Sequence, residues 1–299
     1  MTIRLGINPI GWTNDDVPWL GDELPLDQVL AEGRAAGFTG FELGRKFPRT
    51  AAELGPILDR HELKLASGWY SSRLLERSVA DEMESVADHL TLLKELGAKV
   101  MVFCESSGDV VPLVGAPMST RPQLDGAAAW KDLGRKLTEV ADRLAEAGVA
   151  MTYHHHMGTV VQSEQDIDRL MSATGPSVGL LLDTGHLTYA GGDPVNVAMR
   201  WGSRINHVHA KDIRPAALFA ATERDASFTH AILMGVFTVP GDGMVDYPGV
   251  LAALKAADYS GWIIQEAEQD HRVAPPAAYA RFGHAELLRL CRSAGFTVT

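Results

Sequence analysis

Short β-type runs alternate with longer helical patterns along the chain, and this alternation restricts its fold more than any other feature. Several runs are almost continuously apolar, which is typical of strands buried on both faces of a parallel sheet. The candidate strands cover residues 4–8, 40–43, 63–67, 100–104, 150–154, 178–182, 205–209 and 262–266. Helical patterns between them include residues 25–36, 80–96, 127–147, 163–173 and 247–257. The alternation predicts an α/β fold.

About eight such units with no break in composition predict a single (β/α)₈ TIM-barrel domain over residues 1–299. The competing interpretation is a doubly wound sheet that binds a dinucleotide. That fold places a Gly-x-Gly-x-x-Gly motif after its first strand, whereas this chain has Asn8-Pro9-Ile10-Gly11-Trp12 there. We therefore expect the barrel.

Two connections are longer than a barrel requires, residues 105–125 and 213–246, after the fourth and seventh strands. Long loops in compact domains are usually functional or disordered. Because both follow strands, we expect them on the C-terminal face, where barrel enzymes carry out their chemistry. They are also the segments that could contact a neighbour if the chain forms a homo-oligomer.

The charge of the chain argues against nucleic acid as a partner. It has 27 basic and 38 acidic residues, a net charge of −11, and no run of Lys and Arg. Such a chain repels phosphate backbones unless it carries a basic stripe.

Nothing in the sequence predicts a membrane or secreted setting. The first residues run directly into a strand-like segment without the pattern of a signal peptide, and no run of about 18 apolar residues occurs. Cys104 and Cys291 are too few for a disulfide framework and too far apart for a zinc-type pair. We expect a cytoplasmic protein.

Polar residues gather at the ends of the candidate strands five to eight. These clusters are His154-His155-His156, Asp183-Thr184-Gly185-His186, His207-Val208-His209-Ala210-Lys211-Asp212 and Glu266-Ala267-Glu268. A barrel brings neighbouring strand ends to one mouth. Any one His or Asp at a strand end is more often a loop hydrogen-bonder or a helix cap, but four clusters in register predict a metal site. Imidazole and carboxylate without thiolate suit Mn²⁺ or Co²⁺ first, with Fe²⁺ and Zn²⁺ as alternatives.

Three of these segments resemble the xylose-isomerase-like barrel superfamily: residues 182–186, residues 208–212 and Glu266. The resemblance implies that Asp183, His209 and Glu266 bind the metal. The superfamily usually has a Glu at the end of strand five, where this chain has His154. Two alternatives are open: His154 is the fourth ligand, or three protein ligands share the metal with water and substrate.

Over nearly its whole length the chain resembles the inosose dehydratase family within that superfamily. The matching stretches are residues 6–15, 41–48, 153–159, 235–243 and 266–270, with His271 where that family usually has Pro. The resemblance implies a hydro-lyase of inositol catabolism that removes water from 2-keto-myo-inositol and leaves a trihydroxycyclohexane-1,2-dione.

Such a reaction needs an acid and a base, and the candidates are His156, Lys211 and His186. Strand alternation places His156 on the same face as His154, either as base or as support for a ligand. Lys211 shares a face with His209, and a nearby cation is expected to depress its pKa; its alternative role is a salt bridge with Asp212 or Glu268. His186 is expected to bond the substrate rather than a second metal ion.

A polyol ring also needs partners around its rim. The expected substrate-binding residues are Asn8, Trp12, Glu42, Arg45, Lys46, Trp69 and Glu268. The two tryptophans could stack on the ring, although packing is the more common role for such side chains. Asp242 fits a turn former better than a substrate ligand.

Three other functions compete with the dehydratase. A metal-dependent ketose isomerase or epimerase would use the same site, but His154 stands where an epimerase would place a second carboxylate. A nucleic-acid endonuclease would need a basic groove and more metal ligands. A non-catalytic sugar-binding barrel would bind the ligand without chemistry.

Overall fold

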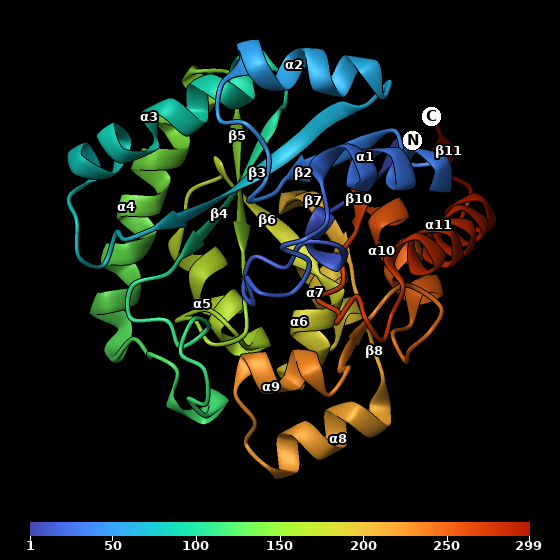
Figure 1. Ribbon diagram of the computed structural model, residues 1–299. Helices are drawn as coiled ribbons and strands as arrows, with labels where there is room; N and C mark the ends of the chain where they lie inside the picture. Colours follow the sequence, from blue (N-terminus) through green and yellow to red (C-terminus); the bar gives the residue numbers. More distant parts are fainter.

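A computed structural model describes residues 1–299, and its parallel strands form a closed ring (Figure 1). The strands of the ring are β1 (Thr2–Ile7), β2 (Gly40–Leu43), β3 (Lys64–Ser72), β4 (Val100–Glu105), β5 (Ala150–His154), β6 (Val178–Asp183), β7 (Ile205–Ala210) and β10 (Gly261–Gln265). Each pairs in parallel with the next, and β1 pairs with β10, so the sheet has no open gap. The short strand β11 (Thr297–Val298) also pairs with β1. The predicted (β/α)₈ barrel is confirmed.

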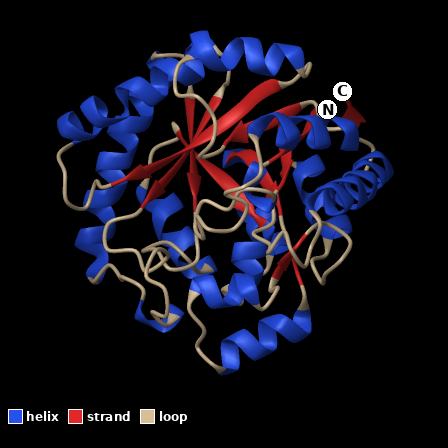
Figure 2. Cartoon of the chain, viewed as in Figure 1, coloured by secondary structure: helices blue, strands red, loops and turns tan.

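Helices surround the ring on the outside (Figure 2). They are α1 (Leu26–Ala36), α2 (Ala51–Arg60), α3 (Val79–Glu95), α4 (Gly126–Glu146), α5 (Glu164–Ala173), α6 (Thr184–Tyr189), α7 (Pro194–Trp201), α8 (Pro215–Glu223), α9 (Phe228–Leu233), α10 (Tyr247–Ala256) and α11 (Pro276–Ser293). Capping boxes at Ser78 and Ser163 begin α3 and α5 by satisfying free backbone N–H groups. Judged by length and hydropathy, none of the helices qualifies as a membrane span.

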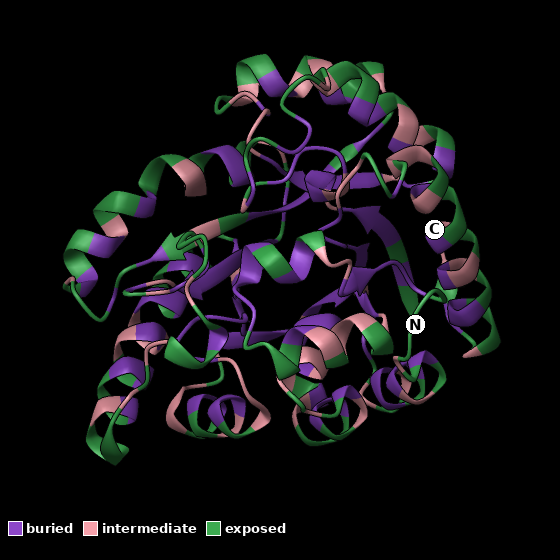
Figure 3. Cartoon of the chain, turned by 60° about the horizontal axis from the view of Figure 1, so that its bottom comes forward, coloured by how far each residue is buried: buried purple, intermediate pink, exposed green.

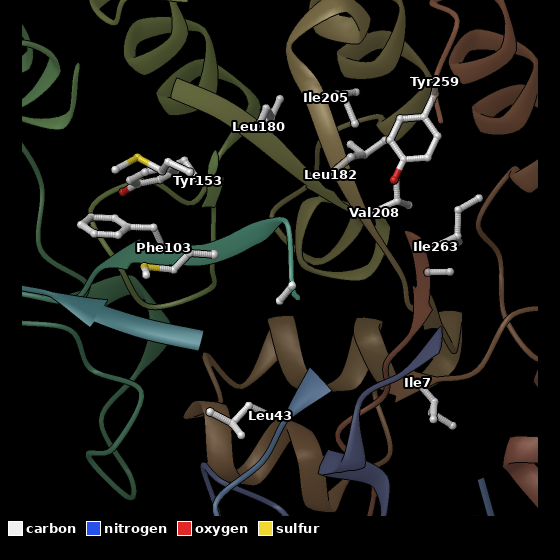
Figure 4. Packing of buried hydrophobic residues seen from close by; sticks show 14 of the residues in the cluster. Ile7, Leu43, Phe103, Tyr153, Leu180, Leu182, Ile205, Val208, Tyr259 and Ile263 are labelled. Atoms are coloured by element: carbon white, nitrogen blue, oxygen red, sulfur yellow. The ribbon is translucent and has the colours of Figure 1, made fainter. Parts of the chain in front are cut away.

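The core lies between the strands and the helices. A cluster of 58 buried apolar residues joins the two layers. Figure 4 shows part of it, including Phe103 of β4 and its register partner Tyr153 of β5. The strands of the ring are mostly buried, whereas the helices expose their outer faces (Figure 3). The apolar runs in the sequence therefore correspond to strands covered on both sides.

The two long connections lie at the C-terminal ends of the strands, as expected. The first contains a short 3₁₀ turn, Met118–Thr120, and the second contains α8, α9 and a two-stranded ribbon of β8 (Asp212–Ile213) and β9 (Phe237–Thr238). They share a separate cluster of 14 buried apolar residues. The backbone N–H of Ser119 donates to Asp225 over 3.0 Å and ties one connection to the other. These segments therefore form an ordered wall beside the mouth of the barrel.

Candidate active site

Four side chains from neighbouring strands converge at the mouth of the barrel. His154 and Asp183 end β5 and β6, His209 lies one residue before the end of β7, and Glu266 directly follows β10. All four are buried, and one donor atom from each lies within 4.8 Å of the others. The structure thus brings together the four residues that the sequence suggested as metal ligands.

The donor atoms of this group are not satisfied by hydrogen bonds to one another. His154 Nδ1 lies 2.6 Å from the backbone oxygen of His155, which can only accept, so Nδ1 holds the proton and Nε2 has a free lone pair. Neither His154 Nε2 nor Asp183 Oδ2, 3.5 Å apart, has a hydrogen-bond partner. Buried polar atoms are seldom left unpaired. Imidazole nitrogens and carboxylate oxygens that face a common point fit a divalent cation.

Glu42 orients the third of these residues, His209. A Glu42 oxygen lies 3.1 Å from His209 Nε2, while His209 Nδ1 lies 2.7 Å from Glu266 Oε2. Glu42 also accepts hydrogen bonds from His207 Nε2 and Asn8 Nδ2, each over 2.8 Å. The carboxylate therefore holds the outer nitrogen of His209 and leaves the inner one facing the cluster.

The charges of these groups follow from burial and from their neighbours. Burial opposes the ionisation of Glu266, but the charges of His209 and Lys211 lower its pKa to about 2. Burial lowers the pKa of His154, which keeps it neutral. Burial also opposes protonation of His209, but Glu266 and Glu42 outweigh it and raise its pKa well above the usual value. A cation bound at His209 Nδ1 would displace that proton.

Lys211 places a buried ammonium beside the cluster. Its Nζ lies 2.7 Å from both Glu266 Oε1 and Glu268 Oε1, 2.9 Å from His186 Nε2 and 3.3 Å from Asp183 Oδ2. The pKa depression expected beside a bound cation stays a prediction, and the surrounding side chains act in the opposite direction. Burial does favour the neutral amine, but the three carboxylates outweigh it and raise the pKa. Of the two salt-bridge partners expected for Lys211, Glu268 pairs with it and Asp212 does not.

His156 and Glu268 extend the cluster toward a cavity, whereas His186 does not. The cavity has a volume of about 410 Å³, and its walls include His156, His209, Glu266 and Glu268. His156 Nδ1 lies 2.8 Å from the backbone oxygen of Met157, so Nε2 is left without the proton. His186 is absent from the cavity wall and packs against His156 with 3.8 Å between ring centroids. The expectation that His186 bonds the substrate is therefore not supported by its position.

The expected substrate-binding residues divide into two groups. Asn8, Glu42, Trp69 and Glu268 line the cavity.

The other three, Trp12, Arg45 and Lys46, do not line it. The Trp12 indole is buried and donates to Glu32 over 2.6 Å. Arg45 pairs with Asp22 at 3.0 Å, and Lys46 Nζ donates to the backbone oxygen of Leu24 over 2.7 Å. These side chains stabilise the first loop rather than the cavity. Asp242 also stabilises a loop: in the connection after β7 it pairs with Arg214 over 2.7 Å.

Several wall residues were not anticipated from the sequence. Asp15, Asp16 and Trp19 come from the loop after β1, Ser71 lies near the end of β3, and Asp109 follows β4. Asp15 faces the cavity, so water reaches part of its side chain. The protein that surrounds the rest of the carboxyl group raises its pKa to about 6. The sequence feature that could have indicated these wall residues is the pair of acids, Asp15 and Asp16, directly after residues 6–14. Their direction toward the cavity depends on the loop's path, which the sequence pattern does not specify.

Comparisons with known proteins identify the family of the chain. A family model described as xylose isomerase-like TIM barrel matches residues 30–291. The chain is 42% identical over 279 residues to an inosose dehydratase of Geobacillus thermodenitrificans (strain NG80-2), which covers 93% of this chain and 94% of the relative. It is 50% identical over 299 residues to the rhizopine catabolism protein MocC of Rhizobium meliloti, covering 100% of this chain and 92% of the relative.

Solved structures share the fold at low sequence identity. The probable 3-DHS dehydratase AsbF from Bacillus anthracis superposes with a TM-score of 0.69 at 14% identity, covering 96% of this chain and 99% of that one. An L-ribulose 3-epimerase superposes with a TM-score of 0.68 at 16% identity, covering 98% and 95%.

The chain belongs to the xylose isomerase-like TIM-barrel family. Within that family its sequence groups it with the inosose dehydratases, and it is a dehydratase, an enzyme of the lyase class.

Proposed function

We propose that the chain removes water from 2-keto-myo-inositol and that His154, Asp183, His209 and Glu266 hold the metal ion that this reaction needs. The observation that carries the proposal is the group of four buried donor atoms within 4.8 Å of one another, beside a cavity of about 410 Å³. Imidazole and carboxylate donors accept Mn²⁺, Co²⁺, Fe²⁺ or Zn²⁺, and we expect Mn²⁺ or Co²⁺ with the other two as alternatives. When bound, the ion supplies positive charge to the ketone oxygen as a Lewis acid.

The cavity suits an uncharged polyol ketone. Its wall contains carboxylates and imidazoles but no Lys or Arg, so it offers no guanidinium or ammonium group to a phosphate. Asn8 and Ser71 offer hydrogen bonds to hydroxyls, and Trp69 offers an aromatic face or edge. The same lack of cations disfavours a nucleic-acid substrate.

The reaction removes the proton on the carbon next to the ketone and the hydroxyl on the following carbon. The resulting enol then rearranges to the 1,2-diketone, so that one water leaves for each molecule of ketone. His156 presents a proton-free Nε2 at the cavity and is our candidate base. Glu268 lines the same cavity, and burial raises its pKa to about 7 although Lys211 at 2.7 Å acts against this, so it can hold the proton that the departing hydroxide takes. Lys211 itself lies behind the wall as the fixed countercharge.

The test is a substrate comparison with purified protein supplied with Mn²⁺ or Co²⁺. We expect 2-keto-myo-inositol to yield the diketone, seen as a new ultraviolet absorbance, and His156→Ala to lower kcat by at least 100-fold. No diketone from 2-keto-myo-inositol, together with isomerisation of a ketose such as fructose, would support the isomerase or epimerase alternative instead.

A further inference from the structure

The position of the Lys211 ammonium resembles a metal site more than a surface ion pair. Four acceptors surround Nζ: Glu266 Oε1 and Glu268 Oε1 at 2.7 Å, His186 Nε2 at 2.9 Å and Asp183 Oδ2 at 3.3 Å. All belong to buried side chains, as Lys211 does. Carboxylate oxygens and an imidazole nitrogen are the donor types that bind first-row divalent ions.

Two of the four acceptors are shared with the proposed metal site. Glu266 turns Oε2 toward His209 Nδ1, 2.7 Å away, and Oε1 toward Lys211. Asp183 Oδ2 lies 3.5 Å from His154 Nε2 and 3.3 Å from Lys211 Nζ. Carboxylates that face two neighbouring cation positions are the usual arrangement of two-metal sites, whose ions lie about 3.5–4 Å apart. Here the second position holds an amine of the chain itself.

The segment after β6 is shaped to admit this lysine. A Cβ on Gly185 would lie 2.4 Å from Lys211 Cγ, so only glycine leaves room for the lysine stem. The Thr184 hydroxyl donates to the Lys211 backbone oxygen over 2.7 Å. On the other side, the Phe237 ring lies 5.1 Å from Nζ. Contacts along the whole side chain therefore fix the ammonium in place.

Charge and distance both favour an ammonium here over a second metal ion. Asp183 and Glu266 contribute two negative charges, and Glu268 adds a third once it has given up its proton; one divalent ion and one ammonium balance these three. The acceptors are 2.7–3.3 Å from Nζ, whereas nitrogen and oxygen ligands approach such ions to about 2.0–2.2 Å. Removal of the ammonium would leave the Glu268 carboxylate without a countercharge. Its Oε2 already has no hydrogen-bond partner.

We propose that the Lys211 ammonium occupies the position of a second divalent ion and so keeps the site mononuclear. The inference rests on the metal site proposed above. It predicts that removal of the amine converts the chain into one that binds two ions, with His186, Glu268, Glu266 and Asp183 as the ligands of the new ion.

The test is the number of Mn²⁺ ions bound per chain at saturation, measured by equilibrium dialysis and metal analysis. We expect one ion for the wild type, two for Lys211→Ala, and one again for Lys211→Ala combined with His186→Ala. Electron paramagnetic resonance should show a coupled Mn²⁺ pair only in the Lys211→Ala chain. The variants are refolded and dialysed in Mn²⁺, so that the ion can replace the missing charge, and Lys211→Ser serves as a second variant.

Each outcome has a distinct meaning. Two ions in the wild type, or one ion in both folded Lys211 variants, would overturn the inference. No ion in the wild type would instead refute the four-ligand site of the proposed function. Retention of two ions after the His186 change would show that the additional ion binds elsewhere, and would also overturn it.

Discussion

The two nitrogens of His209 face different carboxylates, and this difference determines what the side chain can bind. Nε2 lies 3.1 Å from Glu42, and Nδ1 faces Glu266 and Asp183 at 2.7 and 3.5 Å. A proton on Nε2 satisfies Glu42 and leaves Nδ1 as the donor to a cation. Partners of this kind typically contribute 10- to 100-fold in metal affinity.

We predict that Glu42→Gln weakens Mn²⁺ binding about 10- to 100-fold, because the amide no longer holds the proton on His209 Nε2. Calorimetric titration of metal-free protein measures the change. Glu23→Gln is the matched control, since Glu23 also pairs with a histidine, His271, at 2.7 Å but is exposed. Equal affinities for the Glu42 variant and the wild type would contradict the role assigned to Glu42.

Trp69 is the aromatic wall of the cavity, and its substitution tests substrate contact. Its ring lies edge-on to His154 and His156, with centroids 5.2 and 5.6 Å apart, and 38% of the residue is exposed. We predict that Trp69→Ala raises KM about 5-fold, since aromatic contacts of this kind are worth about 1 kcal/mol, and lowers kcat less. Steady-state kinetics with 2-keto-myo-inositol would refute substrate contact if KM stayed at the wild-type value.

Residue types and strand parity were enough to predict which side chains share the mouth of the barrel, but not which way each one turns. His154 and Asp183 lie at the ends of regular strands, where alternation fixes direction. Arg45 and Lys46 follow β2 in a loop, and both turn toward the acceptors around Asp22 instead of the cavity. A bound cation was expected to depress the pKa of Lys211; the carboxylates around it, Asp183 at the end of β6 and Glu266 and Glu268 after β10, act in the opposite direction and raise it.

At the scale of elements, the segment from β6 into α6 supports the site through its shape. Asp183 caps α6 by accepting from the backbone N–H of His186 over 2.7 Å. That bond uses Oδ1 and leaves Oδ2 for the cluster. The sequence allowed a helix cap as the alternative to a metal ligand, and the geometry is compatible with both roles in one carboxylate.

We predict that Gly185→Ala destabilises the protein by about 1–3 kcal/mol and abolishes most activity, because the added Cβ would overlap the Lys211 stem at 2.4 Å. Chemical denaturation and kinetics measure the two effects. Gly55→Ala in α2 is the control, since its nearest neighbour would be an ordinary 3.5 Å away. The control should be slightly stabilised, by about 0.5–1 kcal/mol; a Gly185 variant that behaves in the same way would contradict the tight fit.

Periodicity predicted most elements to within one or two residues, and it was least accurate where polar residues continue a strand. β3 extends to Ser72 rather than residue 67, because Trp69 to Ser72 pair in register with β4. Serines are typical of loops, so the sequence pattern did not indicate that the strand continues beyond residue 67. α8 and α9 also lie inside a connection that the sequence indicated only as long. Their packing depends on a cluster shared with distant loops.

At the scale of the whole molecule, closure of the barrel brings the residues of the site together. The pairing of β1 with β10 brings Asn8 to within 3.1 Å of Glu266, although 258 positions separate them in sequence. The site therefore exists only in the closed fold, and an ion that binds it must stabilise that fold.

We predict that Mn²⁺ at about 100 times its Kd stabilises the protein by about 2.7 kcal/mol, which corresponds to a rise in Tm of roughly 5 °C. The ion offsets the repulsion between Asp183 and Glu266. Differential scanning calorimetry with and without metal measures the rise, and Asp183→Ala should abolish it. The same rise in the Asp183 variant would place the stabilising ion at another site.

The central claim is that one ion held by His154, Asp183, His209 and Glu266 is required for dehydration. The most direct measurement adds Mn²⁺ stepwise to metal-free protein and follows bound metal and diketone formation together. We predict that the rate rises in proportion to bound metal and reaches its maximum at one ion per chain, while Asp183→Ala neither binds the ion tightly nor forms the diketone. Full activity in metal-free protein, or in an Asp183→Ala chain that binds no metal, would contradict the claim.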